Sequence, residues 1–167
     1  LSAAALAMQY KNFGGDKYLK TAEMLFAYAK NHNKSVGTTS GSFYVSSNWE
    51  DDYCLAALLL YQITGNTSYL SEYNQYKNAD AAMKPYWPLG WDNVGPAVAY
   101  YDGNSSKIAS LMGISDGNST YGGYRCVSNW GSARYNTSMQ YTGLLYDKMT
   151  SIETYRGWSE GQMKYCL

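Results

Sequence analysis

This sequence has neither a surplus of charge nor a long apolar run. Its 13 Lys and Arg residues balance 13 Asp and Glu residues, so the formal net charge is zero. Because the two signs are interspersed, there is no basic patch to hold a nucleic acid, and we expect no nucleic-acid partner. The longest apolar run, residues 54–61, is far shorter than the roughly 18 residues typical of a bilayer span. We expect that run to lie in a buried helix and predict no membrane span.

Cysteine is scarce, and its count is odd. The three residues Cys54, Cys126 and Cys166 cannot all pair within the chain. Cys54 and Cys166 fall in helical patterns, where we expect buried thiols. Cys126 falls in a loop, from which it would be able to pair with a cysteine outside this segment. The cysteines therefore do not settle the cellular compartment.

Phenylalanine is also rare, with 3 residues, whereas there are 19 tyrosines and 5 tryptophans. Tyrosine and tryptophan combine an apolar ring with a polar tip, which suits an amphipathic ligand. Sugars are such ligands, because their C–H faces stack on rings and their hydroxyls need hydrogen-bond partners. The alternative interpretation, which we apply to the larger share of the tyrosines, is that they line contacts between helices.

Sequons for N-linked glycans occur repeatedly, most of them in expected loops or helix starts. They favour an extracellular, secreted glycoprotein. The five acceptor positions are Asn33, Asn66, Asn104, Asn118 and Asn136.

The apolar periodicity is helical along the whole chain, with no persistent strand alternation. Helices joined by short turns alternate with long polar loops, as in helical barrels and solenoids. We therefore predict an all-α fold of helical hairpins, with function on the long loops. The expected helices span residues 1–10, 16–31, 50–64, 67–83, 91–101, 105–112, 132–149 and 152–167, and the long loops span 33–49, 84–90 and 113–130.

Both ends of the sequence lie within helical patterns. Residues 1–8 are already helical in character, and the pattern over 155–167 stops without a cap. We therefore expect residues 1–167 to be the middle portion of a single longer domain, with both ends of that domain outside this chain.

Three adjacent acids, Glu50, Asp51 and Asp52, begin one expected helix, just after the oxygen-bearing Ser47 and Asn48. Such oxygens can form a cage for Ca²⁺, which accepts six to eight of them. The alternative interpretation is a solvated helix N-terminus that the acids stabilise through the helix dipole.

Five motifs follow one another along the chain. They are residues 3–7 (AAALA), 44–70 (with Tyr44, Ser46-Ser47 and Asp51-Asp52), 90–93 (GWDN), 130–138 (WGSARYNTS) and 155–165. In this order they resemble the family 9 glycoside hydrolases, which are cellulase-type enzymes. The resemblance implies an (α/α)6 barrel, of which this chain would supply most of four hairpins.

The resemblance also implies a structural calcium ion beneath the substrate cleft. Asp52 stands where the family has Glu, and its shorter reach would weaken the site. The ligands carried over are Ser47, Asn48 through its backbone carbonyl, Asp51, Asp52 and Asp92.

For the substrate, the resemblance implies aromatic platforms and an arginine that hold glucosyl units. The matching positions are Tyr44, Trp87, Trp130 and Arg134. Rings stack on sugar faces, and a guanidinium donates several hydrogen bonds in fixed directions. The alternatives are that Trp130 is a buried loop anchor and that Arg134 forms a salt bridge.

The family cleaves β-1,4-glucan with inversion, using an Asp in an upstream motif and a Glu near the C-terminus. Neither motif occurs here, so we assign no catalytic residue to this chain. We expect part of an endo-β-1,4-glucanase that acts on cellulose or a related β-glucan together with the remaining segments of its catalytic domain. The alternative is an inactive carbohydrate-binding or structural extracellular glycoprotein derived from the same barrel.

Overall fold

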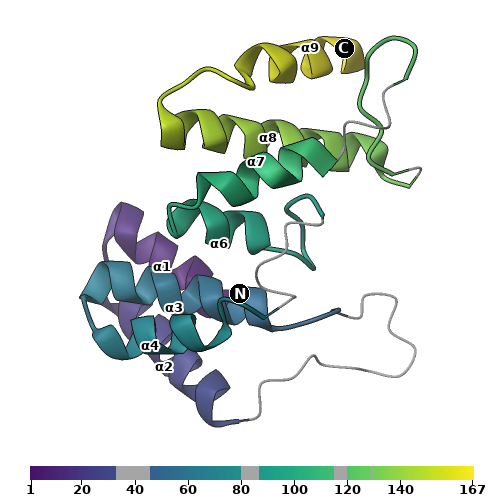
Figure 1. The fold of residues 1–167 in the computed structure, drawn as a ribbon. Coiled ribbons are helices and arrows are strands. Elements are labelled where there is room, and N and C mark those ends of the chain that lie inside the picture. The colour runs from purple at the N-terminus through teal and green to yellow at the C-terminus, as the bar shows by residue number, and fades with distance from the viewer. Residues whose placement is uncertain (33–45, 80–86, 115–119, 129) are drawn as a thin grey trace. The chain divides into compact units, whose positions relative to one another are not determined.

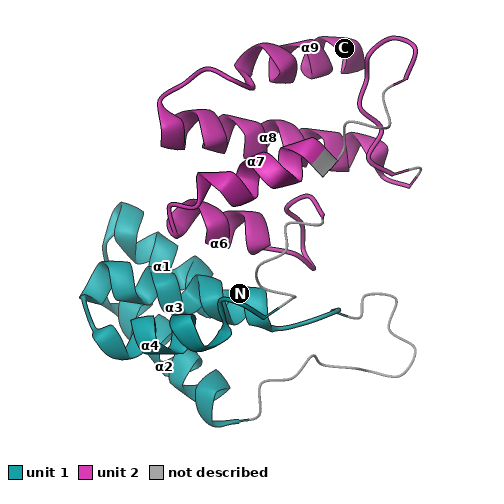
Figure 2. Ribbon diagram, viewed as in Figure 1, with its two compact units in different colours: residues 1–83 teal, residues 84–167 magenta. Residues whose placement is uncertain are grey.

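The computed structural model describes residues 1–32, 46–79, 87–114, 120–128 and 130–167. Within these ranges the regular structure consists of helices (Figure 1), as the sequence predicts. The chain divides into two compact units, Leu1–Met83 (unit 1) and Lys84–Leu167 (unit 2), which Figure 2 distinguishes by colour. None of the described helices is long and apolar enough to cross a membrane.

Unit 1 contains α1 (Ser2–Phe13), α2 (Asp16–Asn31), α3 (Glu50–Thr64) and α4 (Thr67–Tyr76). Helix α3 packs against the other three, and every residue from position 53 to position 60 is buried. A helix that is apolar all round is stable only when neighbours enclose it. Gly65 ends α3 in the left-handed region at φ 70°, where glycine carries no steric penalty, and its N–H donates to the Tyr61 carbonyl at 2.8 Å.

A charged network joins three helices of unit 1. Glu72 on α4 accepts a hydrogen bond from the Tyr53 hydroxyl on α3 at 2.7 Å, and its other oxygen pairs with Lys30 on α2 at 2.7 Å. Burial raises the pKa of Tyr53 well above its usual range, and the hydrogen bond to Glu72 raises it further. Tyr53 therefore stays protonated, and it donates a hydrogen bond between two helices.

Unit 2 contains α6 (Gly95–Tyr101), α7 (Ser105–Ile114), α8 (Ser132–Thr150) and α9 (Arg156–Cys166). Its apolar core is small and is formed by Ala99, Ile108, Leu111, Met112 and Met139. Helix α8 contacts the other three helices of the unit.

Beside this core lies a buried amide network centred on Asn136, which is 0 % exposed. Its side-chain amide donates to the Arg125 carbonyl at 2.9 Å and to Gln162 Oε1 at 2.7 Å. Its carbonyl oxygen accepts from Gln140 Nε2 at 2.7 Å. Because both ends of the Asn136 side chain are buried and bonded, this sequon has no room for a glycan in the folded protein.

Several predicted helix boundaries were wrong, and for two of them the structure shows the cause. Helix α6 begins at Gly95 and not near 91, because Pro96 has no N–H and fits only the first turn. Helix α4 ends at Tyr76, short of 83. Helix α9 begins at Arg156 and not at 152, because the Asp147 carboxylate accepts from the N–H groups of Thr154, Tyr155 and Arg156 and so caps it there.

The cysteines differ from expectation at one position. Cys54 is buried in α3 as predicted, and Cys126 is half-buried. Cys166, predicted to be a buried thiol, is exposed at the last residue of α9. The helical periodicity places Cys166 on one face of α9, but Cys166 lies at the very end of the helix, where its side chain is open to solvent.

Candidate functional site

Two of the predicted sugar-binding residues come together in unit 2, joined by a tyrosine. The Trp87 ring lies 4.9 Å from the Tyr135 ring, centroid to centroid, in an edge-on arrangement at 74°. The Arg134 guanidinium carbon lies 4.4 Å from the centre of the same Tyr135 ring. Trp87 is 40 % exposed and Arg134 is exposed, so both reach solvent. These three residues are called the Trp87–Tyr135–Arg134 cluster below.

The loop before α6 holds Trp87 in place. Asn93 Nδ2 donates to the Trp87 carbonyl at 2.6 Å, and the Gly90 N–H donates to the Asn93 carbonyl at 2.9 Å. From α8, Ser138 Oγ donates to the Leu89 carbonyl at 2.7 Å. These bonds fasten the loop both to itself and to the helix that carries Tyr135 and Arg134.

Trp130 precedes α8 by two residues and is 84 % exposed. The alternative that it is a buried loop anchor is therefore wrong for this chain. Its backbone N–H donates to Ser128 Oγ at 3.3 Å. Trp130 lies four positions before Arg134, next to the Gly131 N-cap of α8, and its ring is open to solvent.

Arg134 does not form, with any residue that the structure describes, the salt bridge that the alternative interpretation expected. Among the residues that the structure describes, it has no carboxylate partner, and its guanidinium lies over the Tyr135 ring instead. A cation over an aromatic face is held electrostatically, while its N–H groups remain donors for other oxygens. The arrangement suits hydroxyl groups of a sugar.

Tyr135 was missed by the sequence reasoning, although it lies in the WGSARYNTS motif next to Arg134. The signal available was an aromatic side chain adjacent to the predicted arginine. Its pairing with Trp87, 48 positions earlier, depends on the tertiary fold and is visible only in the structure. Tyr44, the fourth predicted residue, lies outside the described residues.

The predicted calcium ligands divide between the two units. Ser47, Asn48, Asp51 and Asp52 lie at the start of α3, whereas Asp92 lies in unit 2. Asp51 is only 2 % exposed, and the side-chain oxygen of Asn48 is buried without a hydrogen-bond partner. The Asn48 carbonyl accepts from Ser46 Oγ at 2.8 Å.

These donors are all oxygens, which is the chemistry that Ca²⁺ prefers, and a buried oxygen without a partner is one that an ion would satisfy. No group of three or more His, Cys, Asp or Glu side chains able to hold a metal occurs within the described ranges. The donor chemistry fits calcium, and the calcium site stays a prediction.

The pair Glu50 and Asp51 is poorly suited to acid–base catalysis. Glu50 Oε2 accepts from the Trp49 N–H at 3.1 Å, and Asp51 is buried. Adjacent residues at a helix start also project in different directions. We assign neither a catalytic role.

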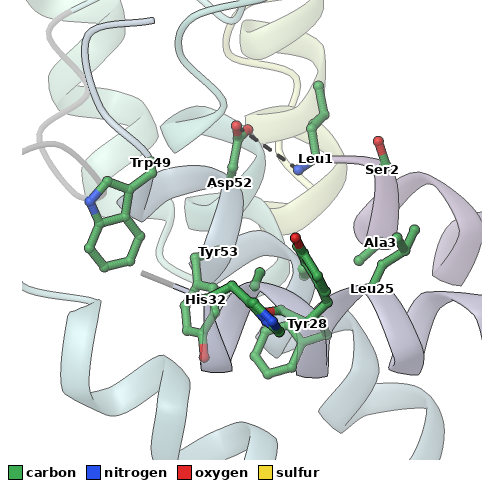
Figure 3. A pocket seen from close by; sticks show the side chains of 12 residues that line it. Leu1, Ser2, Ala3, Leu25, Tyr28, His32, Trp49, Asp52 and Tyr53 are labelled. Carbon is green, nitrogen blue, oxygen red and sulfur yellow. Dashed lines mark hydrogen bonds and ion pairs between the residues drawn. The ribbon is translucent and has the colours of Figure 1, made fainter. Parts of the chain in front are cut away.

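A separate pocket of about 400 Å³ lies within unit 1 (Figure 3). His32 stacks on Tyr28 at 3.9 Å between ring centroids on one side of it. The Asp52 carboxylate points towards the Leu1 amine, 4.0 Å away, as the dashed line shows. Because every residue lining this pocket belongs to unit 1, it is not part of the Trp87–Tyr135–Arg134 cluster.

Comparison with known proteins gives one consistent result. The sequence model of the family described as Glycosyl hydrolase family 9 matches residues 1–167. Endoglucanase A of Fibrobacter succinogenes is 40% identical over 88 residues, which are 50% of this chain and 19% of that protein. Endoglucanase B of Cellulomonas fimi is 26% identical over 200 residues, covering 99% of this chain and 19% of that protein.

Solved structures agree. The catalytic domain of Clostridium thermocellum CelT superimposes with a TM-score of 0.89 at 31% identity, covering 98% of this chain and 42% of that one. The cellulase Cel9M of C. cellulolyticum in complex with cellobiose gives a TM-score of 0.86 at 25% identity, again covering 98% and 42%. This likeness confirms the predicted fold class, helical hairpins that form part of an (α/α)6 barrel. The chain spans 42% of these solved chains and 19% of the two endoglucanases named above.

Proposed function

Because the chain belongs to glycosyl hydrolase family 9, we propose that it is part of an endoglucanase-type enzyme that hydrolyses β-1,4-glucosidic bonds in cellulose or a related β-glucan. The observation that carries this proposal is the Trp87–Tyr135–Arg134 cluster, exposed on a chain whose whole length matches that family. The cellulase Cel9M, which is 25% identical to this chain, is in complex with cellobiose, and this supports a β-glucan as the substrate.

In this proposal the residues of unit 2 bind and orient the polysaccharide. The rings of Trp87 and Trp130 offer apolar faces to the C–H faces of glucosyl units, and Arg134 donates hydrogen bonds to their hydroxyls. Tyr135 contacts both Trp87 and Arg134, so it fixes the spacing between a stacking surface and a donor. Binding spread over several sugar units helps to place one glycosidic bond at the reacting groups.

The reacting carboxylates belong to the remaining segments of the domain in this proposal. Inverting hydrolysis needs a general acid and a general base about 6.5–9.5 Å apart, with a water between the base and the sugar. We propose that mechanism, with no catalytic residue from residues 1–167, and we propose that the complete protein is secreted.

A structural calcium ion is part of the same proposal. Asp51, Asp52, Ser47, the Asn48 carbonyl and Asp92 would hold it, and the ion would neutralise the buried Asp51 carboxylate and brace the start of α3. The buried side-chain oxygen of Asn48 supports a cation in this region.

The test is hydrolysis of soluble carboxymethylcellulose by the complete protein, measured as new reducing ends. We expect product from the wild type and at least tenfold less, at substrate concentrations below KM, from Trp87→Ala with Arg134→Ala combined. Binding of cellotetraose without any release of reducing ends would overturn the proposed enzymatic activity and favour the carbohydrate-binding alternative. Neither binding nor release would reject both.

A further inference from the structure

The loop before α8 lies along the C-terminal half of α9. Gln162 Nε2 donates to the Gly123 carbonyl at 3.0 Å, and Gln162 Oε1 accepts from the Arg125 N–H at 2.8 Å. The Tyr124 ring stacks on the Tyr165 ring, with 4.9 Å between centroids and 22° between planes. Figure 1 shows this loop, in green, beside the end of α9, in yellow. Residues on both sides of Tyr124 are therefore fastened to one face of α9.

The contact is close at Gly122 as well. A Cβ atom added there would lie 2.6 Å from Tyr165 Cε2, so the Tyr165 ring would have to move to admit it. The loop backbone thus lies close against the Tyr165 side chain of α9.

Two cysteines lie at either side of this contact. Cys126 directly follows Arg125, whose N–H is bonded to Gln162. Cys166 is four residues after Gln162, so it lies on the same face of α9, about 6 Å or roughly one turn further along. Both cysteines therefore lie near Gln162, at the same contact between the loop and α9.

Polar side chains surround this contact. Ser132 Oγ donates to Cys126 Sγ at 3.4 Å. Burial raises the pKa of the Tyr124 phenol, Ser132 lowers it, and the neighbouring Cys166 and Cys126 raise it. The Tyr124 side chain, which stacks on Tyr165, is thus an electrostatic neighbour of both cysteines.

We propose that Cys126 and Cys166 form an intrachain disulfide when the protein is in an oxidising environment. Cys166 is exposed and Cys126 is half-buried, so an oxidant can reach the pair, whereas Cys54 is buried in unit 1. Cys166 is the last residue of α9, where helices fray, so its backbone can adjust towards the Cβ–Cβ separation of roughly 3.5–4.5 Å that a disulfide needs.

The chemistry balances with a disulfide oxidant such as oxidised glutathione. The Cys166 thiolate attacks one sulfur of the oxidant and releases one thiolate, which leaves a mixed disulfide on Cys166. The Cys126 thiolate then attacks the Cys166 sulfur and releases the second thiolate. The two cysteines lose two electrons and two protons, and two molecules of reduced thiol carry them away.

The bond would hold the segment that carries Trp130 against α9. Trp130 follows Cys126 by four positions, and α8 begins two positions later. A cross-link between positions 126 and 166 also restricts the unfolded chain, which stabilises the folded state. The disulfide does not depend on the proposed hydrolytic activity.

Peptide mapping of the complete protein tests the proposal. The folded protein is incubated with oxidised glutathione, then denatured in the presence of an alkylating agent that blocks every free thiol, and digested with trypsin without reduction. Trypsin cuts after Arg125, Arg134 and Lys164, so Cys126 lies on peptide 126–134 and Cys166 on a separate peptide that begins at Tyr165. We expect these two peptides to be linked and Cys54 to be alkylated.

Alkylation of both Cys126 and Cys166 would overturn the proposal, as would glutathione retained on Cys166 or a link from either residue to another cysteine. The matched controls are Cys126→Ser and Cys166→Ser, each of which should leave its partner alkylated, and Cys54→Ala, which should keep the linked pair. A reducing agent should lower the Tm of the wild type and of Cys54→Ala by several degrees. An equal fall in Cys126→Ser would contradict the proposal.

Discussion

Unit 1 and unit 2 are each built from four described helices, but they bury different kinds of side chain. Unit 1 encloses an apolar helix, α3, whose residues 53–60 are all buried. Unit 2 has a smaller apolar core and a buried amide network beside it. Apolar burial is non-directional and stabilises a helix in any matching groove, whereas buried hydrogen bonds hold particular backbone atoms in place. The Trp87–Tyr135–Arg134 cluster belongs to unit 2, the unit that contains the buried amide network.

The largest effect on stability should come from a substitution in the apolar core of unit 1. Leu59 on α3 is 1% exposed, so Leu59→Ala removes buried apolar volume and leaves a cavity. We expect the free energy of unfolding to fall by about 2–5 kcal/mol. Urea denaturation of the complete protein measures it, with the exposed Lys20→Ala on α2 as control. A loss below 0.5 kcal/mol, within the range of surface substitutions, would show that α3 is not a packed core helix.

A substitution in the buried amide network of unit 2 should lower the stability nearly as much. Asn136→Ala leaves the Arg125 carbonyl and the Gln140 amide each without a bond now made by Asn136. Each buried polar group left unsatisfied costs about 1–3 kcal/mol, so we expect a loss of about 2–4 kcal/mol. Thr137→Ala, at the exposed neighbouring position, is the matched control in the same urea experiment. If the two variants unfold alike, the network contributes no more than a surface hydroxyl.

The proposed sugar-binding surface should respond differently, because substitutions there should lower the affinity for cello-oligosaccharides and leave the stability unchanged. Trp130 is exposed, so Trp130→Ala removes little buried area and should leave the Tm within a degree or two of the wild type. We expect cellotetraose to bind about tenfold more weakly, equivalent to about 1.4 kcal/mol, by titration calorimetry. Tyr121→Ala, an equally exposed aromatic position outside the cluster, should bind as the wild type does. Equal losses in both variants would remove Trp130 from the site.

The smallest effect concerns pH and the charged network of unit 1. The pKa of Tyr53 is higher in the folded protein than the roughly 10 of an unfolded tyrosine, so its contribution to stability is complete below pH 10 and is lost as pH rises further. Tyr53→Phe should therefore cost about 0.5–1.5 kcal/mol at pH 7 and reduce the loss of stability above pH 10. Urea titrations at several pH values measure both, with Tyr121→Phe as control. An unchanged pH dependence would show that Tyr53 ionises equally in both states.

Local signals in the sequence were sufficient for the helices that have clear ends. Asp16 at the start of α2, the acids at the start of α3 and Gly65 after it match the observed boundaries. Pro96 carried the information that α6 begins late, but the apolar pattern before it outweighed that signal. The start of α9 depends on Asp147, seven to nine positions away, so no local pattern shows it.

For the site, the motifs predicted Trp87 and Arg134 as members of one surface, and the structure places both against Tyr135. Tyr135 and Gln162 were not predicted, because their roles arise from partners 37 to 48 positions away. Periodicity shows which residues share a helix face, but it does not show what covers that face. The exposed Cys166 is the clearest example.

The central claim is that unit 2 binds a glucose polymer. Hydrogen exchange of the complete protein, measured by mass spectrometry with and without cellotetraose, tests this claim most directly. We predict that the ligand slows exchange over residues 87–93 and 130–135, and that the pocket residues of α1 and α2 in unit 1 exchange as before. Protection confined to unit 1, or no protection of either segment in unit 2, would contradict the account.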